Sequence, residues 1–175
     1  MAKHKPGSEK RAATKARLYT VAVLLLDGTI AKRFARRSPK VMRTLQIRGD
    51  QSLERLHLEI FKAFDRYDEH LYEFHFGGKG PHDPDARRYV LPEFAQGDPF
   101  ENREPAGDVR RTTIEALGLK PNDSFAYWFD FGDDWWHQVS VVEIEDDVPS
   151  GTFPRIVQRI GESPPQYVNW DEEEM

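Results

Sequence analysis

The fold is decided by residues 125–137, which read Phe125-Ala126-Tyr127-Trp128-Phe129-Asp130-Phe131-Gly132-Asp133-Asp134-Trp135-Trp136-His137. Aromatic side chains occupy every second position from Phe125 to Phe131, and a β-strand would project all of them from one face. Gly132-Asp133-Asp134 is typical of a turn. The stretch therefore predicts a β-hairpin, whose second strand returns from Trp135 toward Ile144.

The length of the turn decides which returning residues share the aromatic face. A turn with an odd number of residues, such as 132–134, sets Phe131 opposite Trp135 and adds Trp135, His137, Val139 and Val141 to that face. An even turn would instead add Trp136, Gln138, Ser140 and Val142. The odd register buries more apolar area and fewer polar groups, so we expect it. It places Trp135 and His137 in the core and directs Asp130 and Trp136 outward.

Outward from the hairpin, apolar patterns predict further strands and one main helix. Between residues 52 and 66 apolar side chains recur every three or four positions, which indicates an amphipathic helix with Ser52 as its N-cap. A short second helix is expected at about 113–117. Three segments are predicted to be strands, the first of them buried on both faces: 18–26, 41–47 and 71–76.

These elements predict an α+β fold, in which a single mixed or mainly antiparallel sheet carries the main helix (about 52–66) and the short helix (about 113–117). The length of 175 residues suits one domain. We expect a disordered basic arm, a single α+β domain that contains a long loop, and an acidic tail, at residues 1–17, 18–167 (loop 77–107) and 168–175.

Composition excludes several classes of protein. The chain has no cysteine, so it forms neither a disulfide, nor a thiolate metal site, nor a cysteine nucleophile. The longest apolar run, Val21–Leu26, is far shorter than the ~20 residues of a membrane helix. No signal-peptide core follows the basic N-terminus. We therefore expect a cytoplasmic protein that does not contact membranes.

A metal site is an alternative use of the acidic turn. Asp and His bind divalent ions, and a bound metal generates a nucleophilic water, so the chain could be a metal-dependent hydrolase that uses His70, Asp130, Asp133 and His137. Their spacing matches neither a calcium loop nor a zinc helix motif. Solvated turn carboxylates and interior histidines are favoured, and no cofactor is predicted. His57, on the apolar helix face, is expected to be buried with one backbone partner.

The N-terminal arm suggests a third interpretation, a nucleic-acid accessory protein. Basic arms hold nucleic acid through phosphate contacts. Residues 1–17 carry a net charge of +5, while the remaining residues carry −10 and would repel phosphates. A solubilising terminus is therefore favoured over nucleic-acid binding. The candidate phosphate contacts are Lys3, Lys5, Lys10, Arg11, Lys15 and Arg17.

Three blocks of sequence resemble a known family. The first block consists of Leu56-His57, Ile60 and Ala63-Phe64, followed by His70-Leu71-Tyr72-Glu73-Phe74. The second block is residues 127–135 together with His137. The third block consists of Phe153-Pro154-Arg155, Gly161 and Pro164-Pro165. Over roughly residues 18–165 the chain resembles the plasmid pRiA-type open-reading-frame-three-like family, whose members are sometimes described as insertion-element passenger proteins. The resemblance implies an α+β domain and no established reaction.

Two departures from the family pattern bear on function. Gln166-Tyr167 follows the double proline where acidic residues and glycines are common, and Trp136 replaces a usually polar residue. An exposed indole marks a contact surface. We therefore expect a non-enzymatic binding or accessory domain, linked by resemblance to mobile elements, that binds a protein partner. Its expected surface combines the segment 77–107 with Asp130, Gly132, Asp133, Asp134 and Trp136.

Overall fold

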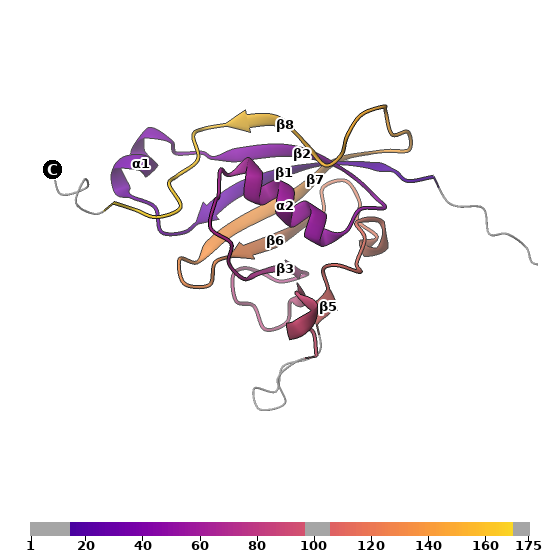
Figure 1. Ribbon diagram of the computed structural model, residues 1–175, viewed down its shortest axis with the longest axis horizontal. Helices are drawn as coiled ribbons and strands as arrows, with labels where there is room; N and C mark the ends of the chain where they lie inside the picture. Colours follow the sequence, from indigo (N-terminus) through magenta and orange to yellow (C-terminus); the bar gives the residue numbers. More distant parts are fainter. Residues whose placement is uncertain (1–14, 97–105, 170–175) are drawn as a thin grey trace, which may run out of the picture.

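A single twisted sheet organises the protein in the computed structural model, which describes residues 15–96 and 106–169. Within these residues the sheet has eight strands in the order β5-β4-β3-β6-β7-β1-β2-β8 (Figure 1). In chain order the elements are β1 Leu18–Asp27, α1 Lys32–Arg37, β2 Met42–Arg48, α2 Leu53–Ala63, β3 Tyr72–Phe76, β4 Arg87–Val90, the 3-10 turn η1 Pro92–Phe94, β5 Gly107–Asp108, the 3-10 turn η2 Glu115–Leu117, β6 Ser124–Phe129, β7 Trp135–Glu145 and β8 Arg155–Ile160.

The expected α+β fold class is wrong, because the protein is mainly β. In the described part of the chain the two α-helices have only 6 and 11 residues, and the helix expected at 113–117 is the 3-10 turn η2. Strands β4 and β8 escaped prediction because they are short and rich in arginine, which obscures apolar alternation. The sheet is mixed, since β4 and β5 pair in parallel and the other neighbours are antiparallel.

The segment expected as a long loop at 77–107 contains β4, η1 and part of β5. Residues 97–105 of that segment, most of the basic arm (1–14) and most of the acidic tail (170–175) lie outside the described residues. No helix in the ranges 15–96 and 106–169 has the length and apolar composition that crossing a membrane requires.

Strands β6 and β7 form the expected hairpin in the odd register. Phe129 pairs with Trp135 and Tyr127 pairs with His137. The turn has five residues, 130–134, and is longer than predicted, but an odd length still sends the same side chains to the core. Phe131 departs from the prediction: it lies in the turn, is 38% exposed, and stacks on Trp128 with ring centroids 3.9 Å apart.

Helix α2 covers one face of the sheet, which we term the inner face (Figure 1). The hydroxyl of Ser52 accepts a hydrogen bond from the Arg55 backbone N–H at 3.3 Å, which confirms the predicted N-cap. The helix ends at Ala63, earlier than predicted. Its apolar side belongs to one hydrophobic core with buried residues of the strands, each of which stabilises the fold by about 1.5–3 kcal/mol: Tyr19, Val21, Val23, Leu45, Ile47, Phe74, Phe125, Phe129, Val139 and Val141.

The opposite face, termed the outer face, is only partly covered. Burial along β1 alternates, so the expectation of a strand buried on both faces is wrong. Tyr19, Val21 and Val23 are buried against the inner face, whereas Leu26 on the outer face is 51% exposed. Cover for the outer face comes from the segment that follows β3, where the His82 ring packs on the sheet.

Replacing Gly28 by alanine should destabilise the protein. A Cβ at this position would lie 2.2 Å from Cε3 of Trp135, and the backbone φ is +156°. Overpacking of this kind costs about 1–3 kcal/mol. We expect urea unfolding of Gly28→Ala to show a free energy of unfolding lower by about 2 kcal/mol or more. Gly80→Ala is the control, because nothing lies within 4 Å of the added Cβ; equal stabilities would contradict the close packing.

Candidate functional site

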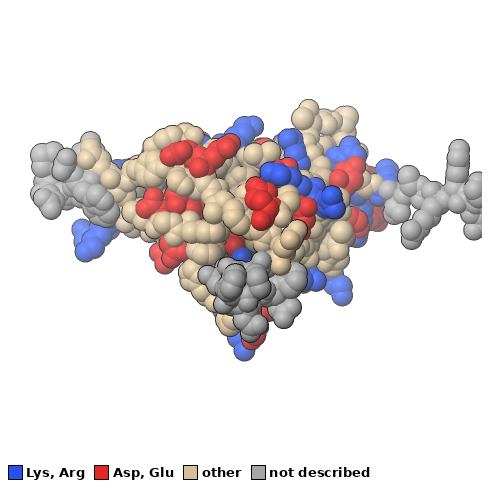
Figure 2. Space-filling view, turned by 60° about the horizontal axis from the view of Figure 1, so that its bottom comes forward, with Lys and Arg blue, Asp and Glu red and all other residues tan. Residues whose placement is uncertain are grey.

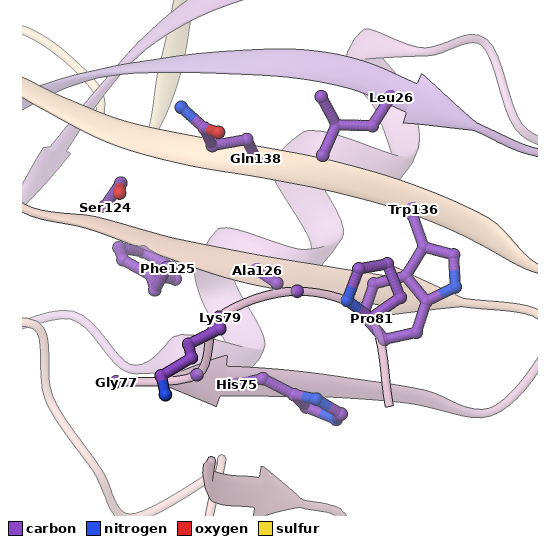
Figure 3. Close-up of a pocket in the computed structure, with 12 residues that line it drawn as sticks. Leu26, His75, Gly77, Lys79, Pro81, Ser124, Phe125, Ala126, Trp136 and Gln138 are labelled. Atoms are coloured by element: carbon purple, nitrogen blue, oxygen red, sulfur yellow. The ribbon is translucent and has the colours of Figure 1, made fainter. Parts of the chain in front are cut away.

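A pocket of about 270 Å³ opens on the outer face, between the strands and the glycine-rich segment that follows β3 (Figure 3). Polar and apolar groups line it in similar measure. The polar groups fix the orientation of a ligand in such a site, and the apolar ones supply contact area. The lining residues are Leu26, His75, Gly77, Gly78, Lys79, Gly80, Pro81, Ser124, Phe125, Ala126, Trp136 and Gln138.

The pocket exists because a small side chain interrupts the outer face. Ala126 pairs with His75 on one side and Gln138 on the other, and the next row of the outer face carries Trp128 opposite Trp136. Because the methyl group of Ala126 is much smaller than the two indoles in the next row, a hollow remains on the sheet above Ala126. The chain turns over this hollow directly after β3, at Gly77, whose φ of +77° favours glycine.

Trp136 lines one side of the pocket and belongs to a stack of aromatic rings, here termed the aromatic wall. Trp136 stacks on Trp128 at 5.0 Å and 8°, and the edge of the His82 ring meets both indoles. The indole N–H groups of both tryptophans donate to Oδ1 of Asp134, at 2.7 Å for Trp128 and 2.9 Å for Trp136. Buried indoles need such an acceptor. The acidic turn therefore supports the aromatic wall.

Trp136 corrects one expectation about the binding surface. It lies on the outer face as predicted, yet it is only 2% exposed and does not form an exposed contact. Its cover includes Trp128 from the neighbouring strand and His82 from a segment distant in sequence. The alternation of residues predicts the face of a side chain but not what is laid over that face, so the sequence missed this burial.

A buried polar group supports the floor of the pocket beside β3. Arg88 donates to both carboxylate oxygens of Glu73, at 2.8 and 2.5 Å, and Nε2 of His75 lies 2.9 Å from the same carboxylate. Burial raises the pKa of Glu73, but the hydrogen bonds from His75 and Arg88 outweigh burial and lower it to about 2. The ionised carboxylate assigns the proton to Nε2 of His75. The other ring nitrogen, Nδ1, is buried without a partner among the described residues.

The carboxylate of Asp130 turns to the other side of the acidic bend. Asp130 was expected to face outward, but it is 5% exposed. Its Oδ1 accepts the backbone N–H groups of Gly132 and Asp133, at 3.1 and 3.3 Å, and its Oδ2 lies 3.4 Å from Nε2 of His70. Asp130 is therefore a turn-capping residue rather than a surface group. Gly132 and Asp134 are exposed and Asp133 is half-buried.

Beside this bend, the residues after the double proline fasten the chain to the turn that precedes β3. Gln166 is buried; its amide oxygen accepts from the N–H groups of Tyr67 and Asp68, and its amide nitrogen donates to the Asp68 carbonyl. The Tyr167 hydroxyl lies 2.9 Å from Nε2 of His70 and donates to Asp68. Gln166 and Tyr167, which depart from the family pattern, therefore have a structural role: their hydrogen bonds connect the end of the domain to residues 67–70.

The structure brings together only part of the proposed metal set. His70 and Asp130 are neighbours, whereas His137 is 1% exposed in the core, where its ring packs on Phe64 at 4.8 Å. Across residues 15–96 and 106–169, no group of three or more His, Asp or Glu side chains has a geometry that could hold a metal ion. The residues of the alternative interpretation do not form one site.

His57 differs from its prediction in one respect. It is buried on the helix, as expected, but its Nδ1 lies 2.8 Å from the hydroxyl of Tyr127 rather than beside a backbone group. Its ring stacks on Tyr72 with centroids 3.5 Å apart and planes at 2°. The partner could not be read from the helix alone, because it belongs to β6.

Comparison with known proteins identifies the family. The sequence pattern of the plasmid pRiA4b ORF-3-like proteins matches residues 32–170. The chain belongs to this family. It is 32% identical over 133 residues to the uncharacterized protein y4hQ of Sinorhizobium fredii (strain NBRC 101917 / NGR234), a match that covers 74% of this chain and 60% of that protein. The chain thus spans about three fifths of the length of that relative.

The fold recurs in a protein of Methanosarcina mazei Go1. The crystal structure of MM3350 from Methanosarcina mazei Go1, a protein of unknown function, superposes with a TM-score of 0.60 at 19% sequence identity. The match covers 83% of this chain and 71% of that one. At this identity the likeness concerns the fold alone, so the pocket of the pRiA4b ORF-3-like protein must be judged on its own side chains.

The basic arm of this pRiA4b ORF-3-like protein is described only at its end. Lys3, Lys5, Lys10 and Arg11 lie outside the described residues. Lys15 pairs with Asp147, and Arg17 pairs with Glu115 at 2.5 Å. On the face shown in Figure 2, basic and acidic groups alternate without a continuous basic patch. The two described arm residues are thus held by the domain's own acids.

Removing the Asp134 carboxylate should weaken the aromatic wall. Asp134 has a φ of +57°, so Asp134→Gly keeps the backbone unstrained while it leaves two indole N–H groups without their acceptor. We expect the free energy of unfolding to fall by about 1–3 kcal/mol, together with a change in tryptophan fluorescence. Asp133→Ala, on the same turn, should leave both unchanged. Equal behaviour of the two variants would refute the role of Asp134.

Two buried histidines should make stability depend on pH. Burial lowers the pKa of His57 and of His137 to about 3, whereas a histidine in the unfolded chain titrates near ~6.5. The unfolded state therefore binds more protons between these values, so stability is fully present above pH ~6.5 and declines as the pH falls toward 3. Each histidine adds a slope of up to about 1.4 kcal/mol per pH unit.

Urea unfolding between pH 7 and 5 tests this slope. His137→Phe should remove about half of it, because the apolar ring binds no proton. A slope that His137→Phe does not reduce would show that His137 is protonated in the folded state.

Proposed function

We propose that this pRiA4b ORF-3-like protein is a non-enzymatic binding domain whose ligand occupies the pocket on the outer face. The observation that carries the proposal is a preformed hollow that polar and apolar side chains line together. Nδ1 of His75, a buried polar atom without a partner in the described structure, adds support. Such atoms are rare in folded proteins and call for a water or a ligand group.

The size of the pocket limits the ligand. A volume of about 270 Å³ equals the liquid volume of roughly nine water molecules. A ligand of about ten non-hydrogen atoms, such as a small molecule or one side chain of a protein partner, fits this space. The acidic turn then has a supporting role, because Asp134 orients the two indoles of the wall.

Binding can be tested with three phenyl compounds of matched size. We expect phenylacetate, phenylacetamide or phenethylamine, added to the full ¹⁵N-labelled chain, to shift NMR signals of residues 77–81, 124–126 and 136–138. Ala126→Ile fills the hollow with a side chain that strands favour, so it should abolish these shifts while the protein stays folded.

Thr44→Ile is the matched control, because Thr44 lies on β2 and does not line the pocket. It should bind as the parent protein does. If none of the three compounds shifts these signals, or if Ala126→Ile leaves the shifts intact, the pocket is not a binding site and the proposal fails.

A further inference from the structure

We infer that the pocket takes a carboxylate-bearing ligand with a short apolar body, an inference that rests on the proposed function. The charge of the lining is the first argument. Lys79 is the one Lys or Arg among the twelve lining residues, and none of the twelve is Asp or Glu. The chain as a whole has 30 acidic residues against 25 Lys and Arg, so this lining runs against the average charge of the protein.

Two acidic groups close to the pocket already have partners within the fold. Glu73 receives two hydrogen bonds from Arg88 and lies 2.9 Å from Nε2 of His75. The Arg88 guanidinium therefore balances the negative charge of the Glu73 carboxylate. Asp83 accepts the backbone N–H groups of Lys79 and Asp85, at 2.7 and 2.9 Å, and it is not among the lining residues. Asp83 therefore holds the segment in shape, and its carboxylate attracts the Lys79 ammonium without forming an ion pair with it within 4 Å in the described structure.

Neutral polar groups complete the arrangement. The amide of Gln138 and the hydroxyl of Ser124 line the same pocket, and both can donate to a carboxylate (Figure 3). His75 holds its proton on Nε2, toward Glu73, so its Nδ1 accepts a hydrogen bond from a water that accompanies the ligand. Lys79, Gln138 and Ser124 are thus the lining side chains that can donate to an anionic group.

The apolar part of the ligand has its own contacts. Leu26 and Trp136 come from two neighbouring strands, β1 and β7, and line the pocket together with Pro81. A ring or short alkyl group removed from water by these side chains supplies affinity, while Lys79 selects the charge. The ligand class that fits both features is a small aromatic or aliphatic carboxylate.

The test compares the same three compounds by charge. At fixed ionic strength, NMR titration of the full chain should give phenylacetate at least a tenfold lower Kd than phenylacetamide, and phenethylamine the highest Kd. Lys79→Met keeps an unbranched side chain but removes the charge, so it should bring phenylacetate to the Kd of phenylacetamide. Lys62→Met, on α2 at the inner face, is the matched control and should keep the preference.

The outcomes separate the two proposals. If phenylacetamide or phenethylamine binds in the pocket as tightly as phenylacetate, the carboxylate inference is overturned while the proposed function stands. The inference is also overturned if Lys79→Met keeps the full preference for phenylacetate. If no compound shifts the pocket signals, the proposed function itself fails.

Discussion

The pairing of Phe129 with Trp135 across the five-residue bend is the constraint on which the rest of the structure depends. Because side chains alternate along a strand, this one pairing assigns every residue of β6 and β7 to a face. Tyr127 and His137 meet α2 on the inner face, while Ala126 and Trp136 face the pocket. A shift of one residue in the pairing of β6 with β7 would send the core residues of one strand to the outer face and its pocket residues to the core. The same pairing therefore positions both the core and the pocket.

Two contacts hold Trp135 at this junction. Its ring lies so close to Gly28 that no side chain is possible there, and the Arg66 guanidinium lies 3.7 Å from the ring centroid. Burial lowers the pKa of Arg66 to about 10, which leaves it charged at neutral pH. Cation–π attraction offsets part of the cost of burying that charge. The end of α2, the turn after β1 and the hairpin are thus joined through one indole.

The acidic bend is a structural device in which each carboxylate has a separate task. Asp130 caps backbone N–H groups inside the turn, and Asp134 accepts both indole N–H groups on the outer face. Both residues have positive φ, which Asp tolerates better than most residues. The carboxylates that suggested a metal site in the sequence therefore hold the turn and the two indoles in position. In the binding mode we propose, the charged group that contacts the ligand belongs instead to the segment after β3, where Lys79 lies.

The sequence by itself determined the hairpin, its odd register, the N-cap at Ser52 and the family, because period-2 alternation and capping are local properties. Only the tertiary structure decided that the fold is mainly β, since short arginine-rich strands such as β8 carry no apolar period of their own. The burial of Trp136 also depends on the tertiary structure, because the rings of Trp128 and His82 that cover it come from other segments of the chain. The tertiary structure also formed the pocket, because Ala126, His75 and Lys79 have no fixed spacing along the chain and meet only when β3 pairs with β6.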